Sequence, residues 1–335
     1  MDESALHEEH IIGLLKNLPS QEEEEAIAVY SGEPESLGKV EQFFAQIITI
    51  PRLASRLEVW RFKIKFQDDV DDLKQNISTI DDAAREILEC YKLRDVLTYI
   101  LAVGNFMNFG PHRPLTQGFK IDFLAKLEQT RSIDNKKHFL HFLATHIMKE
   151  RKDLMTLSEA MPHVVAAAQL PSKSFAADLA KLKSNIEYAK REAKLATPPE
   201  GVTDDLFQEK INAWVFDAEL MLDQVERQLR SMNAAVKSVM TYFAEGPEEA
   251  FETVAGVLSH FLLSLDVAIR DNEREIAAAE KKKAIEDRKV ANAAKKAAAK
   301  QRPTATRRKG VLDNINKTIR RGAFKELDNL QADEE

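Results

Sequence analysis

The stretch that decides the fold is FQEKINAWVFDAELMLDQVERQLRSMNAAVKSVMTYF, residues 207–243. Apolar residues recur in it at intervals of three or four. They are Phe207, Ile211, Trp214, Ala218, Met221, Val225, Leu229, Met232, Val236, Val239 and Phe243. This spacing places them along one face of an α-helix. The stretch therefore predicts one long amphipathic helix that buries this seam.

The preceding stretch carries a second seam with the same heptad spacing. Its members are Phe175, Leu179, Leu182, Ile186, Ala189 and Ala193. A break at Thr197-Pro198-Pro199-Glu200-Gly201 separates the two seams. Two long helices joined by a short Pro/Gly turn are expected to fold back antiparallel. Both seams are compatible with an intermolecular coiled coil, but we favour the core of a helical bundle within the chain.

Similar periodicity predicts further helices upstream, and Ser20 with Glu23 has the spacing of a capping box. The expected helices are Glu41 to Ile50, Ile77 to Met107, and about Phe123 through Lys152, with breaks at Pro51, Gly110 to Gly118, Pro162 and Pro171. Only 11 Gly and 11 Pro occur in 335 residues, which also favours helices over turn-rich β-folds. The expected class is all-α and elongated, with antiparallel long helices.

A last long helix begins after Gly246-Pro247, and its apolar face is expected to stop near Ile276. Residues 277–300 are nearly all Ala, Lys and Glu, which favour a helix but provide no stripe to bury. We expect a charged, solvated helix that projects from the body. Arg302-Pro303-Thr304 should end it and leave a short C-terminal amphipathic helix.

The amino-acid composition indicates a cytoplasmic protein without an integral membrane segment. Hydrophobic residues make up 44% and charged residues 31%, with a formal net charge of −7. Cys90 is the single cysteine, so no internal disulfide is possible, and the acidic N-terminus lacks a signal-peptide pattern. The nearest approach to a membrane span is the short Val254 to Leu265 stretch.

Motifs for catalysis or for cofactors are missing from the sequence. It has no Gly-rich phosphate loop, no dinucleotide fingerprint and no His-Glu-x-x-His helix. The spacing of His138, His141 and His146 does not put all three on one helical face, so we expect core or surface histidines rather than metal ligands. Cys90 lies in an apolar pattern without a base partner and is interpreted as a buried structural cysteine. We expect no enzyme activity, cofactor or metal.

The most informative stretch is Val103 to Asn108, VGNFMN. Gly104 would let another chain segment approach closely, and the amides of Asn105 and Asn108 suit exposed backbone groups. Phe106 and Met107 supply apolar surface. Ordinary helix packing would explain the same residues.

An ordered series of motifs resembles the second formin homology domain over about Ser4 to Arg274. The motifs are Glu41-Gln42-Phe43-Phe44, Pro51-Arg52-Leu53 through Arg56-Leu57, Gly104 to Asn108, Gly118-Phe119, Leu124-Ala125-Lys126-Leu127, Thr130 to Lys137 and Phe139 to Leu143. The resemblance implies actin as a partner and a cytoskeletal location. In this family the Gly-Asn-x-Met-Asn region belongs to the post, the surface that receives the partner subunit's N-terminal lasso.

The resemblance implies roles for individual residues of this chain. The resemblance assigns the lasso-receiving surface to Gly104, Asn105, Phe106, Met107, Asn108, Gly118 and Phe119. It assigns actin contact to Arg131, Lys136 and Lys137. The family's lasso, linker and first part of the knob would precede Ser4. We therefore expect this chain alone to be mainly monomeric and to nucleate actin poorly.

Three hypotheses follow for the function of the whole chain. The first is a factor for actin filament nucleation and barbed-end elongation that is autoinhibited by its own tail. The second is a lasso-less interaction protein that pairs with complete formin subunits and regulates them without assembling actin. The third, a general coiled-coil scaffold, explains the heptads but not the motif series.

The tail carries a second resemblance, to the diaphanous autoregulatory segment, through Val311, Leu312, Asp313, Ile315, Ile319 and Phe324. It implies an inhibitory armadillo-type domain as the tail's partner and indirect control by a Rho-type GTPase. Val311, Ile315 and Ile319 form an apolar ridge at helical spacing with basic residues around it, although a frayed tail helix would show the same pattern. Lys281 to Lys300 is interpreted as a spacer, with attraction to acidic surfaces such as actin as the alternative; nucleic acid is not expected because aromatic residues are absent there.

The expected division is residues 1–276 for the N-terminally incomplete formin homology domain and 277–306 for the basic helix and linker. Residues 307–326 form the autoregulatory segment and 327–335 an acidic tail.

Overall fold

A computed structural model describes residues 6–110, 115–132, 137–196, 205–246 and 248–301, together with residues 314 and 317. The chain divides into two units, Met1–Arg270 and Asp271–Glu335. Every regular element in the described residues is a helix, and the pairing of Arg131 with His138 is an isolated β-bridge. The predicted all-α class is confirmed.

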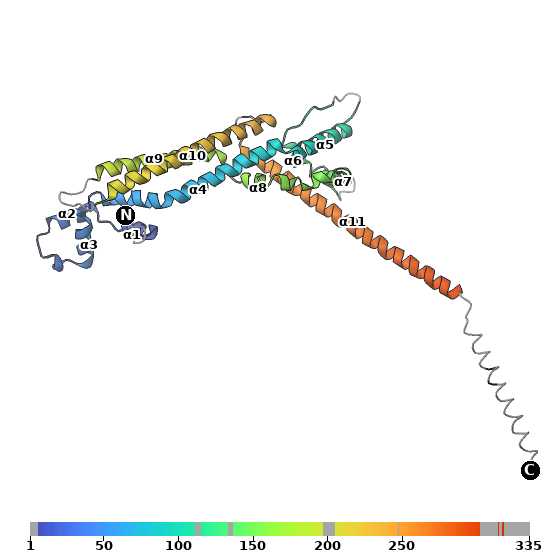
Figure 1. Ribbon diagram of the computed structural model, residues 1–335, viewed down its shortest axis with the longest axis horizontal. Coiled ribbons are helices and arrows are strands. Elements are labelled where there is room, and N and C mark those ends of the chain that lie inside the picture. Colours follow the sequence, from blue (N-terminus) through green and yellow to red (C-terminus); the bar gives the residue numbers. More distant parts are fainter. Residues whose placement is uncertain are drawn as a thin grey trace, which may run out of the picture. The chain divides into compact units, whose positions relative to one another are not determined.

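Three long helices build the body of the first unit. They are α4 (Leu53–Glu89), α9 (Phe175–Leu195) and α10 (Phe207–Tyr242), which lie side by side in Figure 1. Each of the three contacts the other two. Ion pairs join Lys183 to Glu226 and Lys190 to Glu219, so α9 and α10 run antiparallel. The seams thus form the core of a bundle within the chain, and at about 1.5 Å rise per residue α4 makes this bundle elongated.

Two ion pairs hold one end of the bundle. Arg52 donates from its guanidinium to both carboxylate oxygens of Glu192 at 2.7–2.8 Å. Arg56 pairs with Asp205 at 2.7 Å, and both side chains are largely buried. Because Asp205 lies just before α10 and Glu192 near the end of α9, these contacts fix the start of α4 to both helices.

Short helices precede α4. They are α1 (Glu8–Lys16), α2 (Gln21–Val29), the 3-10 turn η1 (Pro34–Ser36) and α3 (Lys39–Ile47). The predicted capping box is confirmed, since the Ser20 hydroxyl accepts from the backbone N–H of Glu23 and the Glu23 carboxylate accepts from the N–H of Ser20. Ile11 of α1 is fully buried, and Glu8 pairs with Arg61 and Lys65 of α4.

Shorter elements follow α4. They are α5 (Tyr91–Met107), α6 (Phe123–Lys126), α7 (Phe139–Glu150), η2 (Lys152–Thr156), η3 (Ser158–Ala160), α8 (His163–Ala167) and η4 (Ser172–Ser174). The expected helix from Ile77 to Met107 is wrong, because Cys90 takes an extended conformation (φ −68°, ψ 99°) and separates α4 from α5. The expected helix from Phe123 to Lys152 is also wrong, because backbone pairing at Thr130 to Phe139 interrupts it. Cys90 is buried, as expected.

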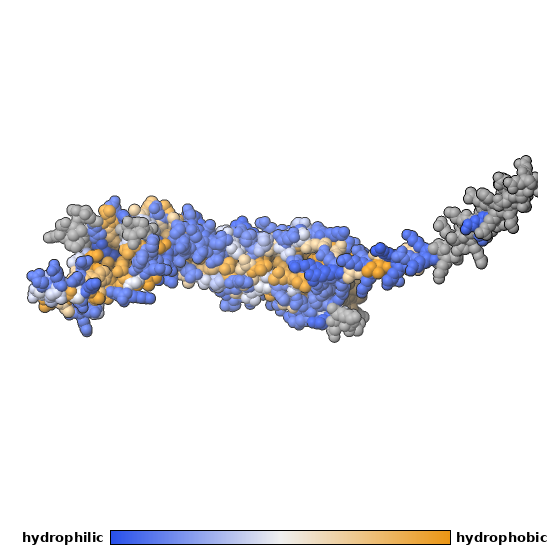
Figure 2. Space-filling view, turned by 90° about the horizontal axis from the view of Figure 1, so that it is seen from below, coloured by the Kyte–Doolittle hydropathy of each residue, from blue (hydrophilic) through white to orange (hydrophobic). Residues whose placement is uncertain are grey.

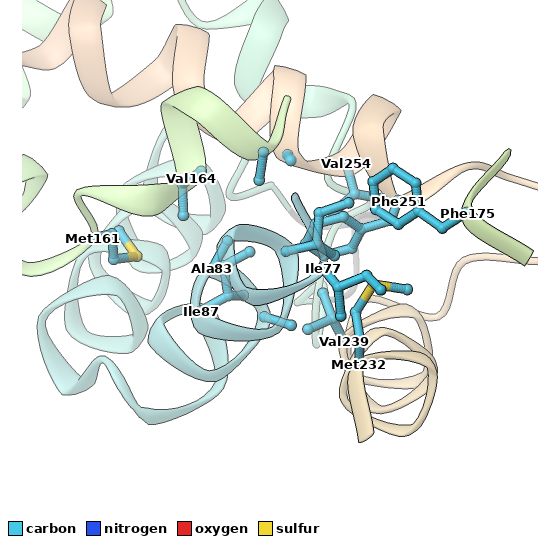
Figure 3. Packing of buried hydrophobic residues seen from close by; sticks show 14 of the residues in the cluster. Ile77, Ala83, Ile87, Met161, Val164, Phe175, Met232, Val239, Phe251 and Val254 are labelled. Carbon is cyan, nitrogen blue, oxygen red and sulfur yellow. The ribbon is translucent and has the colours of Figure 1, made fainter. Parts of the chain in front are cut away.

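The core gathers side chains from elements far apart in the sequence. Figure 3 shows Ile77 and Ala83 of α4, Phe175 of α9, Met232 and Val239 of α10, and Phe251 and Val254 of α11 pointing toward one another. Burying each of the larger side chains contributes about 1.5–3 kcal/mol. Figure 2 shows that hydrophobic residues also reach the surface in patches between hydrophilic ones.

Helix α11 (Phe251–Gln301) begins in this core and continues into the second unit. One stretch of its described part is long and apolar enough to cross a membrane, and half of that stretch is buried inside the protein, as in a core helix. The last buried apolar residue is Ile269, and Ile276 is about half exposed, so the apolar face ends earlier than expected. From Glu273 to Lys296 every side chain is exposed, which confirms a solvated helix.

Candidate functional site

One face of α5 forms the centre of the candidate site. Leu97, Leu101, Gly104 and Asn108 follow one another at intervals of four, three and four residues, and therefore lie on one side of the helix. None of the four is buried. A Cβ atom added at Gly104 would meet no atom within 4 Å, so no other part of the described chain covers this position. We call these four residues the α5 face.

A groove of about 370 Å³ runs beside the first half of this face. Its walls come from α5, from the segment around α6 and from the end of α10; they include Leu97, Leu101, Phe119, Ile121, Leu124, Tyr242 and Phe243. Phe119 is half-buried, and its ring lies 5.4 Å from that of Phe123. Apolar walls with an open mouth suit an apolar side chain from outside.

The other residues of the motif have different surroundings. The side-chain amide of Asn105 donates to the carbonyl of Thr116 at 2.8 Å, and its oxygen accepts from the backbone N–H of Thr116 at 2.9 Å. Asn105 is therefore engaged within the chain, where it fixes the segment that leads to Gly118 and Phe119. A Cβ at Gly118, as at Gly104, would meet open space.

Phe106 points away from the α5 face, since it lies about 200° around the helix from Gly104, whereas Met107, at about 300°, lies at the edge of this face. Phe106 is 83% exposed and Met107 62% exposed. Phe109 and Leu115 add further exposed apolar surface. The five residues Gly104 to Asn108 thus present two surfaces, the α5 face and an exposed apolar tip.

The segment between α6 and α7 carries the predicted basic residues. Arg131 pairs with His138 in the β-bridge, and the backbone N–H of Ser132 donates to the carbonyl of Lys137 at 2.8 Å. These bonds bring the backbone at Arg131 and at Lys137 close together, and we call this part of the chain the basic turn. Lys136 lies outside the described residues.

The basic turn is anchored to the body. Glu128 accepts a hydrogen bond from Ser264 of α11 and lies 3.3 Å from His260 Nε2. The Ser264 bond and the His260 imidazole lower the pKa of the Glu128 carboxyl below its usual value, despite partial burial. His138 and His141 contact each other edge to face, whereas His146 stacks on Tyr99 of α5. The three histidines are therefore not brought together, and the described residues contain no group suited to hold a metal ion.

Comparison with known families decides the assignment. The family model described as "Formin Homology 2 Domain" matches residues 1–266. The chain belongs to the formin homology 2 family. That match spans the three-helix bundle, the α5 face and the basic turn.

Named formins are similar to this formin homology 2 chain over most of its length. It is 31% identical to "Formin-like protein 3" of Oryza sativa subsp. japonica and 32% identical to "Formin-like protein 14" of Arabidopsis thaliana, over 86% and 84% of the chain. It is 30% identical to "Formin-H" of Dictyostelium discoideum over 84% of the chain. The aligned part spans only about a quarter of each relative's length.

Sequence reasoning missed part of the site. The interval pattern from Leu97 to Asn108 carried a signal for the α5 face. Tyr242 and Phe243 of the groove carried none, because they lie far away in the sequence and reach the site only through the length of α10. The predicted tail residues Val311, Leu312, Asp313, Ile315, Ile319 and Phe324 lie outside the described residues.

Proposed function

We propose that this chain is an actin-binding cytoskeletal regulator of formin type. It acts in the cytoplasm with a second formin subunit, and promotes filament nucleation and barbed-end elongation. The observation that carries the proposal is the open α5 face with its groove, in a chain of the formin homology 2 family. The work is binding and positioning, so no catalytic group is required.

The α5 face and its groove would receive the lasso of the partner subunit. Gly104 lets a chain segment approach the helix, and the groove beside Leu97 and Phe119 accepts an apolar side chain. Asn108 offers an exposed amide for the partner's backbone. If the chain pairs with a complete formin without assembling actin, the same face would serve the alternative function of a regulator.

The basic turn would contact actin through Arg131, Lys136 and Lys137. Its hydrogen-bonded ends and the Glu128 anchor hold two of these cations in a defined place, which favours attraction to an acidic partner surface. The tail from Val311 to Phe324 would regulate this activity by binding an armadillo-type domain, with a Rho-type GTPase releasing it. The sequence resemblance alone supports that regulatory step.

The subunit contact is tested by Gly104→Leu, with Gly256→Leu in α11 as the matched control. Both glycines are helical and face open space, so both variants should fold and gain up to about 1 kcal/mol of helix propensity. Sedimentation of each variant with a complete formin homology 2 domain should show weaker pairing, by at least about tenfold, for Gly104→Leu alone. Equal pairing by both variants would contradict the assignment of the α5 face.

The actin contact is tested by changing all three cations of the basic turn to Ala. Filament co-sedimentation should weaken and lose salt dependence, because exposed charges act through attraction that salt screens. The control replaces three exposed cations elsewhere in the bundle, Lys181, Arg227 and Lys237. Fluorescence assays of filament assembly with a complete subunit then separate an assembly factor, which accelerates growth, from a regulator, which binds without acceleration.

A further inference from the structure

A second groove, of about 510 Å³, lies between α9 and α10. Trp214 of α10 packs against Phe62 and Phe66 of α4. Asp223, about two and a half turns later, lines the groove and so lies on the opposite side of α10. The groove is therefore the side of the α9–α10 pair that α4 does not fill, and its floor is formed by buried Ile186 and Leu222.

Two large apolar side chains stand on the rim. Phe216 is 66% exposed and Leu220 is 50% exposed, although both belong to α10, one of the three long helices of the bundle. They lie one turn apart, on the side of α10 away from its buried seam. The bundle core does not use them. A pair of apolar anchors one turn apart beside a groove is the arrangement that receives an amphipathic helix.

The charges of the rim select among possible occupants. Lys183 is paired with Glu226 at 2.6 Å, and Lys190 with both Glu187 and Glu219. Asp217 and Asp223 flank the apolar pair on either side and have no ion-pair partner among the described residues. The rim therefore presents an unbalanced negative charge. A symmetric contact with a second copy would set these carboxylates against the same carboxylates, which is unfavourable.

We propose that the α9–α10 groove docks a basic amphipathic helix of another protein. The partner's apolar stripe covers Phe216 and Leu220, and its Lys or Arg side chains pair with Asp217 and Asp223. The docked helix would complete a four-helix bundle with α4, α9 and α10. This surface is separate from the α5 face and from the basic turn, and the inference does not depend on either.

The test uses two labelled synthetic peptides of about three heptads with Leu at the a and d positions. One peptide carries Lys at e and g, and the other carries Glu. The full chain should bind the Lys peptide at least about tenfold more tightly than the Glu peptide in fluorescence anisotropy. Phe216→Ser with Leu220→Ser should abolish the difference, whereas Leu263→Ser with Val267→Ser, another exposed apolar pair one turn apart on α11, should leave it unchanged.

A second part of the test reverses the charge of the two unpaired carboxylates. Asp217→Lys with Asp223→Lys should weaken the Lys peptide and strengthen the Glu peptide, which nonspecific adhesion would not do. Circular dichroism verifies that each variant folds, and actin co-sedimentation should be unaffected. Equal binding of both peptides, an unchanged preference in the Phe216/Leu220 variant, or concentration-dependent self-association that this variant removes would each overturn the proposal.

Discussion

Helix α10 and the exposed part of α11 show two ways of stabilising a long helix. Nine residues of α10 are buried, from Phe207 to Val239, and their seam packs on α4 and α9. From Glu273 to Lys296, by contrast, every side chain of α11 is exposed. That part relies on the helix propensity of Ala, Lys and Glu and on local pairs such as Lys289 with Glu286 at 3.6 Å. The first helix depends on tertiary burial, and the second depends on local interactions.

The largest expected effect is on the burial that holds the bundle. Phe66 is 2% exposed and packs edge-on against Trp214 at 5.4 Å. Phe66→Ala should lower the free energy of unfolding by about 3–5 kcal/mol, because it removes apolar contact and leaves a cavity. Ile285→Ala, at an exposed position of α11, should change it by less than about 0.5 kcal/mol. Urea denaturation measures both, and similar losses would mean that the two regions are not stabilised differently.

The second effect concerns the buried ion pair of Arg56 with Asp205. Asp205→Asn should cost about 3 kcal/mol, because it leaves the Arg56 guanidinium buried without its counterion. The matched control is Asp271→Asn, whose pair with Arg274 is exposed and should contribute less than about 1 kcal/mol.

The same pair predicts a pH dependence. The hydrogen bond from Arg56 lowers the pKa of the Asp205 carboxyl in the folded chain. The stability it supplies is therefore present above the unfolded pKa, about 3.9, and is lost as the pH falls through the lower folded value. Asp205→Asn should remove this part of the acid sensitivity. An unchanged difference in stability between variant and parent from pH 7 to strong acid would contradict it.

Helices that bury a long apolar seam were predicted well from the sequence. Breaks that depend on local backbone conformation or backbone pairing were not. The seams of α9 and α10 were found because their apolar spacing is long and uninterrupted. The break at Cys90 was missed because Ile87, Cys90 and Leu93 continue the helical spacing, and no Gly or Pro marks the change in backbone direction. The break within Phe123 to Lys152 was missed because backbone pairing across the basic turn has no signature in apolar spacing.

The candidate site was predictable only in part for the same reason. The motif from Gly104 to Asn108 lies on α5, the helix of the candidate site, but spacing alone did not reveal that Asn105 binds Thr116 within the chain. It also did not reveal the groove, because Tyr242 and Phe243 arrive from the end of α10. Contacts between residues distant in sequence form only when the bundle forms.

A smaller effect lies at the contact of α8 with α4. His163 Nδ1 lies 2.5 Å from Glu86 Oε1, and the His163 backbone N–H donates to Glu86 Oε2 at 3.0 Å. The side-chain bond to Glu86 raises the pKa of His163. This stability is therefore fully present below the unfolded pKa, about 6.5, and is lost as the pH rises through the folded value. Thermal unfolding of His163→Gln should lose this dependence on the alkaline side, while Asp205→Asn should retain it.

The smallest effect on global stability is expected in the exposed part of α11. A substitution there distinguishes local from tertiary stabilisation most clearly. Ala284→Gly should cost about 1 kcal/mol of local helix stability, because glycine has more backbone freedom to lose. Amide hydrogen exchange should accelerate in the neighbouring turns, while the urea midpoint of the first unit stays unchanged.

Ala218→Gly in α10 is the matched substitution in the bundle, where the alanine is 1% exposed. There the same loss of propensity should appear in the cooperative unfolding of the whole unit, because α10 cannot fray without uncovering the seam that it shares with α4 and α9. If Ala284→Gly shifted the global midpoint as much as Ala218→Gly, the exposed helix would be coupled to the bundle and would not be stabilised by its own residues alone.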